Sequence, residues 1–234
     1  MAKKIYILCR KERITVNINN LLIKHYLKNV MFINGTAYAG KSTMAKMLAD
    51  KYGLIHCGEN YDCIPAEILT PDKYPNLYYT FNVKDWQEFI NRTPEVYAKW
   101  ISGNTRELIE FEITYLISVS KSQKVIVDTN LPIDVLREIA DYNQVAIMLS
   151  PQSMSVEHFF DRDDKNFFKE KIMESENPEK AMANFLNCIA RISSKEIYDE
   201  FADSGFFTIV RNDAATDTKA EIIEILAKHF GLTN

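Results

Sequence analysis

A glycine-rich segment at residues 35–43 constrains the fold of this chain more than any other feature. It reads Gly-Thr-Ala-Tyr-Ala-Gly-Lys-Ser-Thr, a full match to the pattern G-x-x-x-x-G-K-[ST]. The apolar run at residues 30–33 precedes it, as a buried strand would, and residues 42–52 follow with Met and Leu side chains at helical spacing. A strand, a loop and a helix in this order predict the start of an α/β domain.

The residue types in this loop are suited to binding a phosphate group. Gly35 and Gly40 allow the backbone to approach an anion closely, and the N-terminus of the following helix adds a positive potential. Lys41 supplies a cation for the β- and γ-phosphates, and the Ser42 hydroxyl is a Mg²⁺ ligand. The pattern therefore predicts a nucleotide triphosphate, ATP, with Mg²⁺. The expected contact residues are Gly35, Thr36, Ala37, Tyr38, Ala39, Gly40, Lys41, Ser42 and Thr43.

Composition excludes several other classes of protein. The chain has 234 residues, 47% of them hydrophobic, so we expect one sizeable core. The 28 basic residues are scattered among 32 acidic ones, for a net charge of −4, which predicts no nucleic-acid surface. No apolar stretch approaches the length of a membrane span, and the start of the chain does not resemble a signal peptide.

The cysteines predict a cytoplasmic protein with reduced thiols. They form no C-x-x-C pair, and a nucleotide motif accompanies them, so a disulfide framework is not expected. The four residues are Cys9, Cys57, Cys63 and Cys188.

Strand-like and helix-like segments alternate along the chain after the loop. Further strands are expected at residues 54–57, 124–128, 145–149 and 206–210. Helices are expected over residues 94–119, from Pro132, across most of residues 156–194, and from Thr218, where Glu221 completes a capping box. This alternation predicts a P-loop NTPase fold: a three-layer α/β/α sandwich with a five-stranded parallel sheet and a helical lid.

The first 29 residues do not fit this scheme. We therefore divide the chain into an N-terminal arm, residues 1–29, and a kinase-like domain, residues 30–234, with residues 156–194 as its helical lid. An appended arm and a functional module are both compatible with the sequence of residues 1–29.

A second metal ligand is expected at the end of the strand at residues 124–128. Asp128 closes this apolar strand downstream of the loop, where a carboxylate can orient Mg²⁺ together with Ser42. The alternative is an Asp that caps the turn before Pro132.

Candidate bases follow the strand at residues 54–57. Glu59 and Asp62 lie where substrates bind in a parallel sheet, outside the carboxyl ends of the strands. A carboxylate there can accept the proton of an attacking hydroxyl. Solvated loop acids are an equally good interpretation.

Two arginines in the helical region are candidates for contact with the nucleotide. Arg162 could reach over from a lid and neutralise charge on the γ-phosphate, and Arg191 is a second candidate. For Arg162 the alternative is a surface ion pair with Asp161 or Asp163.

These motifs resemble those of the P-loop kinases for nucleotides and small molecules, a group that includes adenylate kinase, shikimate and gluconate kinases and chloramphenicol phosphotransferase. The resemblance is specific at residues 35–43 and weaker at residues 126–128. The sequence of residues 54–59 is similar to the adenylate-kinase strand that ends in Thr-Gly-Asp. The resemblance implies a phosphoryl donor in the loop, an acceptor beyond the second strand, and a lid over both. It also implies that residues 211–214 edge the adenine.

Two departures from the nucleoside monophosphate kinases favour a hydroxyl acceptor. Asp62 stands near the position where those enzymes have an Arg for the acceptor phosphate, and residues 129–132 replace their Gly-Phe-Pro-Arg. Without these guanidinium groups a phosphorylated acceptor loses its bidentate partners. The sequence thus favours a kinase that phosphorylates a hydroxyl of a small molecule.

Two other functions stay open. One is a nucleoside monophosphate kinase that uses Arg92, Arg106 or Arg137 for the acceptor phosphate. The other is a nucleotide-dependent regulatory ATPase. The sequence does not determine the oligomeric state.

Overall fold

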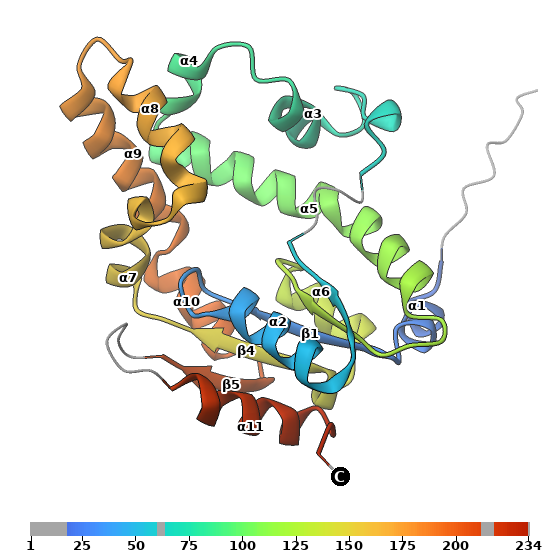
Figure 1. Ribbon diagram of the computed structural model, residues 1–234. Coiled ribbons are helices and arrows are strands. Elements are labelled where there is room, and N and C mark those ends of the chain that lie inside the picture. The colour runs from blue at the N-terminus through green and yellow to red at the C-terminus, as the bar shows by residue number, and fades with distance from the viewer. Residues whose placement is uncertain (1–17, 60–63, 212–217, 234) are drawn as a thin grey trace, which may run out of the picture.

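The computed structural model describes residues 18–59, 64–211 and 218–233, so the predicted base Asp62 lies outside the described residues. A five-stranded sheet in the order β2-β3-β1-β4-β5 forms the centre of the protein, and every strand pair is parallel (Figure 1). The strands are β1 Val30–Gly35, β2 Ile55–Cys57, β3 Val125–Asp128, β4 Val145–Leu149 and β5 Phe207–Val210. The predicted fold class, a P-loop α/β/α sandwich with five parallel strands, is confirmed.

The helices alternate with these strands. They are α1 Asn20–Tyr26, α2 Lys41–Tyr52, α3 Pro75–Phe81, α4 Trp86–Ile90, α5 Pro94–Val119, α6 Ile133–Ile139, α7 Gln152–Glu157, α8 Asn166–Met173, α9 Pro178–Ile192, α10 Lys195–Ala202 and α11 Lys219–His229. Short 3-10 turns are η1 Ala66–Ile68, η2 Tyr142–Gln144, η3 Phe159–Asp161 and η4 Asp163–Lys165. In the described part of the chain, none of these helices is long and apolar enough to cross a membrane.

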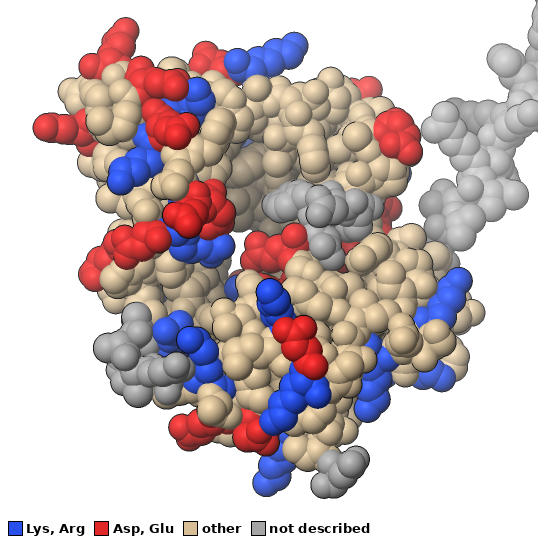
Figure 2. All heavy atoms as spheres, in the orientation of Figure 1, with Lys and Arg blue, Asp and Glu red and all other residues tan. Residues whose placement is uncertain are grey.

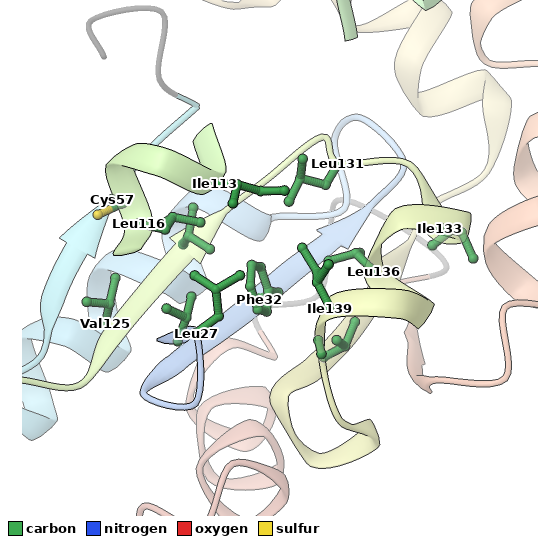
Figure 3. Packing of buried hydrophobic residues seen from close by; sticks show 14 of the residues in the cluster. Leu27, Phe32, Cys57, Ile113, Leu116, Val125, Leu131, Ile133, Leu136 and Ile139 are labelled. Carbon is green, nitrogen blue, oxygen red and sulfur yellow. The ribbon is translucent and has the colours of Figure 1, made fainter. Parts of the chain in front are cut away.

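Helices cover both faces of the sheet. On one face, Phe32 of β1 belongs to a buried cluster with Leu116 of α5 and Leu136 of α6, which Figure 3 shows from close by. On the other face, Leu48 of α2 and Leu226 of α11 pack against the sheet. The central strands are buried throughout because both of their faces are covered.

Part of the predicted N-terminal arm contributes to this core. Leu27, which follows α1, is fully buried in the first cluster, and Ile23 packs against it. Asn19 caps the helix by accepting a hydrogen bond from the backbone N–H of Leu21 at 2.8 Å. The described end of the arm thus packs on the sheet layer.

The predicted capping box at the start of α11 is wrong. Thr218 is the N-cap residue, but its side chain makes no capping hydrogen bond. Its φ of −103° and ψ of 11° differ from the extended backbone with which an N-cap hydroxyl reaches the first turn.

A second hydrophobic core lies beside the sheet. We call it the aromatic cluster; it contains Tyr79, Trp86, Phe89, Tyr97, Trp100, Phe159, Phe160, Phe168 and Phe185. These rings come from α3, α4, the first half of α5, η3, α8 and α9. Helix α5 is about 39 Å long at 1.5 Å per residue, so one end packs in this cluster and the other on the sheet (Figure 1).

Candidate functional site

The glycine-rich loop lies at the carboxyl end of β1. This strand pairs with β3 on one side and β4 on the other, and the loop therefore occupies the point where the strand order reverses. Gly35 has a φ of +128°, and a Cβ there would lie 1.9 Å from the Met148 carbonyl oxygen. Gly40 has a φ of +91°. Only glycine adopts these positions without a clash or strain, which explains both glycines of the motif.

Polar side chains of the neighbouring strands hold the loop in shape. Asn34 donates to the Leu131 carbonyl at 2.6 Å and accepts from the backbone N–H of Gly35 at 2.7 Å. The Ser150 hydroxyl, just after β4, donates to the Ala37 carbonyl at 2.6 Å. The loop is thus fixed from both adjacent strands.

Lys41 begins α2 and points back under the loop. It is 7% exposed, its Nζ donates to the Thr36 carbonyl at 3.3 Å, and it lies 4.0 Å from Oδ1 of Asp128. The N-terminus of α2 leaves backbone N–H groups unpaired within the helix. An ammonium group and these donors together form a site for a phosphate.

Ser42 and Asp128 lie in direct contact. The Ser42 hydroxyl donates to Oδ2 of Asp128, and the Asp128 residue is 1% exposed. Its other oxygen, Oδ1, is buried without a hydrogen-bond partner. Burial raises the pKa of this carboxyl above its usual value, against the opposing effect of Lys41.

An unpartnered buried carboxylate oxygen beside a hydroxyl fits a hard cation such as Mg²⁺. The described residues contain no group of three or more His, Cys, Asp or Glu side chains that could hold a metal ion. Mg²⁺ at this position would therefore depend on Ser42, Asp128 and the phosphates of a nucleotide.

Glu59 lies two residues beyond β2 and is exposed. A neighbouring acid that the sequence analysis missed, Glu112 of α5, is 5% exposed and accepts a hydrogen bond from the Thr129 hydroxyl at 2.5 Å. Burial raises the pKa of Glu112 to about 7, and the charges of Asp128 and Glu59 contribute in the same direction. The three carboxylates thus lie near one another at the carboxyl ends of β2 and β3.

A sequence signal for Glu112 existed. The residue stands four positions after Leu108 and four before Leu116, and side chains at this spacing share one face of a helix. Both leucines are buried. An acid within an apolar stripe is a buried carboxyl, and such groups are uncommon without a role.

Arg162 forms an ion pair, but with a different partner from the alternative that the sequence suggested. Its Nε and Nη2 donate to the two carboxylate oxygens of Asp164 at 2.8 and 2.9 Å. Asp161 instead accepts a hydrogen bond from Nδ1 of His158 at 2.7 Å. The Arg162 guanidinium also lies 5.8 Å from the centre of the Tyr38 ring, which places it beside the loop.

Arg191 and Arg211 are placed differently from each other. Arg191, at the end of α9, contacts Ser194 and Glu196 at 3.5 Å on the surface. Arg211 follows β5, and its Nη1 donates to the Tyr38 carbonyl at 3.3 Å. The remainder of the predicted adenine segment, residues 212–214, lies outside the described residues. Residue 211 was predicted only as part of the adenine segment. The contact of the Arg211 side chain with the glycine-rich loop was not predicted.

Figure 2 shows that the molecule is hollowed between the layer of α3 and α5 and the layer of α2, with acidic side chains at the bottom of the hollow. The loop and the carboxylates described above lie at the carboxyl ends of the strands and on α5. These parts of the protein border this space (Figure 1).

No family model and no curated protein match the chain. Among solved structures, a provisionally assigned kinase from Chloroflexus aurantiacus is 11% identical, with a TM-score of 0.44 over 88% of this chain and 97% of that one. Dephospho-CoA kinase from Campylobacter jejuni is 15% identical, with a TM-score of 0.39 over 88% of this chain and 99% of that one. Both TM-scores are below 0.5, so neither similarity indicates a function for this chain.

Proposed function

We propose that this protein is an ATP- and Mg²⁺-dependent kinase that transfers the γ-phosphoryl group to a hydroxyl of a small molecule. The observation that carries the proposal is the arrangement of Lys41, Ser42 and Asp128 under the loop, with Oδ1 of Asp128 buried and unpartnered. This arrangement would put a phosphate site next to a cation site at the carboxyl ends of β1 and β3.

The donor half acts by position and charge. Backbone N–H groups of the loop and of the first turn of α2 hold the β- and γ-phosphates, and Lys41 balances the charge that develops during transfer. Ser42 and Asp128 would hold Mg²⁺, which would supply positive charge to neutralise the phosphates. Arg162 adds a further cation from the lid formed by α7, α8 and α9.

The acceptor half supplies a base. Glu59 stands two residues beyond β2, where its carboxylate would take the proton of the acceptor hydroxyl as the oxygen attacks the γ-phosphorus. Asp62 is the alternative base. Glu112 provides a further carboxylate on this side of the cleft, where it can accept a hydrogen bond from the acceptor.

The contacts of three arginines support a hydroxyl acceptor over a nucleoside monophosphate. Arg92 pairs with Glu88 at 3.0 Å and lies over the Tyr79 ring. Arg106 forms an exposed ion pair with Asp134 at 2.9 Å.

Arg137, the third of these arginines, donates to the Ser204 carbonyl at 2.9 and 3.1 Å. Each guanidinium is therefore engaged elsewhere, whereas the acids remain near the cleft. A phosphorylated acceptor would meet carboxylates in place of its bidentate partners.

A coupled ADP-release assay tests the proposal. The panel would contain nucleosides, sugars, hydroxy acids and amino alcohols on one side and nucleoside monophosphates on the other. ADP release that depends on a hydroxyl compound supports the proposal. Turnover with monophosphates alone would replace it with a nucleoside monophosphate kinase.

The variant Glu59→Gln separates a kinase from a regulatory ATPase. In a kinase, it should lose acceptor phosphorylation and keep ATP binding. Slow hydrolysis that no acceptor changes, together with macromolecule binding only in the ATP form, would favour the regulatory ATPase.

A further inference from the structure

Tyr38 has an unusual backbone conformation in the loop. Its φ is +64°, and it is the only non-glycine residue with a positive φ in the part of the chain that the structure describes. An L side chain rarely adopts this conformation, and such residues persist where surrounding contacts hold them. The contacts of Tyr38 with neighbouring elements therefore hold its backbone in this conformation.

The Tyr38 side chain leaves the loop and reaches the lid. Its hydroxyl donates to the Phe159 carbonyl in η3 at 2.9 Å. The Phe159 ring lies 5.0 Å from Phe160 and 5.6 Å from Phe185, both in the aromatic cluster. One hydrogen bond thus joins the phosphate loop to the core of the lid.

Two arginines converge on the same residue. The Arg162 guanidinium lies 5.8 Å from the centre of the Tyr38 ring, and Asp164 holds the guanidinium by two hydrogen bonds. From the other side, Arg211 donates to the Tyr38 carbonyl at 3.3 Å. The ring and the backbone of Tyr38 therefore face one cation each.

A neighbouring contact strengthens the same connection. The Ser155 hydroxyl of α7 donates to the Ala37 carbonyl at 3.3 Å, and Ser155 is 1% exposed. The middle of the loop is thus bonded to α7 and to η3, which are the first elements of the lid. A shift of the loop on nucleotide binding would move both contacts.

We propose that Tyr38 is a positioning residue that couples occupancy of the phosphate loop to the lid and thereby places Arg162 toward the γ-phosphate. The placement of Arg162 rests on the proposed kinase function, but the coupling itself requires only nucleotide binding. Tyr38 does not take part in bond making or breaking.

Tryptophan fluorescence measures this coupling directly. The chain has two tryptophans, and both Trp86 and Trp100 belong to the aromatic cluster. Rings connect them to the tyrosine contact: Trp86 lies 6.4 Å from Phe168, which lies 5.6 Å from Phe185. We expect MgATP to change the fluorescence of the wild-type protein.

The variant Tyr38→Phe removes only the hydroxyl. We expect ATP affinity, measured by calorimetry, to stay within about twofold, while the fluorescence change falls by more than half. Tyr38→Gly relieves the backbone strain without restoring the link, so it should lose the fluorescence change as well. Tyr26→Phe, at a tyrosine of α1 that is 52% exposed, is the matched control and should leave both readings unchanged.

A kinetic cycle tests the role of Arg162. Tyr38→Phe should lower kcat by about five- to tenfold, the effect of one hydrogen bond, with little change in KM for ATP. In an Arg162→Gln background, Tyr38→Phe should have no further effect, since the residue acts through Arg162.

Two results would overturn the proposal. One is a fluorescence change on MgATP binding in Tyr38→Phe as large as in the wild type. The other is a loss of kcat from Tyr38→Phe that is equal in the wild-type and Arg162→Gln backgrounds. If no acceptor is phosphorylated at all, the kinase function fails, and calorimetry with fluorescence still decides the coupling.

Discussion

The two sides of the cleft are built in different ways. On the donor side, consecutive residues of one loop form the site, and strand neighbours satisfy its polar groups. On the proposed acceptor side, the groups come from the segment after β2, from α5 and from the residue after β3, and Glu112 is buried with a hydroxyl as its partner. The donor side is thus mostly a local structure, to which Asp128 of β3 is added by the fold, whereas the acceptor side exists only in the folded chain.

Buried side-chain atoms without hydrogen-bond partners lie in two parts of the molecule. Among the described residues, the buried unpartnered side-chain atoms are Trp100 Nε1, Asn104 Oδ1 and Asp128 Oδ1. Two of the three belong to α5, and the third belongs to the proposed cation site. Leaving such atoms unpaired costs free energy, and the fold accepts this cost near the site and in the aromatic cluster.

The largest expected effect is on the donor side. Lys41→Ala removes the buried ammonium group and should lower phosphoryl transfer by about a thousandfold, the scale of losing one electrostatic contact in a water-excluded site. Steady-state ADP release measures this effect. Lys46→Ala, at an exposed position of the same helix, is the control and should retain activity. Full activity of Lys41→Ala would rule out the proposed donor site.

Gly35→Ala tests how tightly the loop is built. The new Cβ would lie 1.9 Å from the Met148 carbonyl oxygen at a φ of +128°, so the free energy of unfolding should fall by about 3 kcal/mol or more. Chemical denaturation measures this change. Gly58→Ala, where a Cβ meets nothing within 4 Å, should change stability by less than about 1 kcal/mol. Equal losses in both variants would contradict the interpretation.

Glu112→Gln tests the acceptor side. Above pH 7, where Glu112 is ionised, the acceptor KM should rise about tenfold, the effect of one charged hydrogen bond, while KM for ATP stays constant. Glu107→Gln is the control on the same helix, because Glu107 accepts hydrogen bonds from the backbone N–H groups of Asn76 and Leu77 at the start of α3. That variant should lose stability without a change in acceptor KM.

The same carboxyl predicts a pH dependence of stability. The pKa of Glu112 is about 7 in the folded protein, above the ordinary value of 4.5 for a glutamate, so the folded state binds the proton more tightly. Its contribution to stability is full below pH 4.5 and declines as the pH rises to about 7, by up to about 3 kcal/mol. The difference in unfolding free energy between the wild type and Glu112→Gln should follow this decline. A flat difference between pH 4.5 and 7 would place the carboxyl in a more polar environment.

The smallest effect is expected at Arg106. Its ion pair with Asp134 is exposed, with 55% and 59% of the side chains accessible, and Arg106→Ala should change stability by less than about 1 kcal/mol. Acceptor KM should not change. A large rise in KM for a monophosphate would instead give Arg106 a role in binding an acceptor phosphate.

Local patterns predicted the fold with small errors. Helix α5 begins and ends at the predicted residues 94 and 119, because Pro94 and the Thr93 cap define its start. The ends of β2, β3, β4 and β5 were predicted to within one residue, since buried strands read as continuous apolar runs, whereas β1 extends two residues beyond the predicted run at residues 30–33. The ion-pair partner of Arg162 was not predicted, because three neighbouring aspartates compete and only the turns η3 and η4 select Asp164.

The sequence by itself predicted the glycine-rich loop between β1 and α2, the placement of Asp128 at the end of β3, and the order of strands and helices along the chain. These features depend on consecutive residues, or on the spacing of apolar residues within a single segment. Only the tertiary structure decided which acids lie near one another, which arginines are already paired, and that Tyr38 contacts both Phe159 of η3 and Arg211. The last contact joins residues 173 positions apart, and the packing of distant segments, which no local spacing encodes, brings them together.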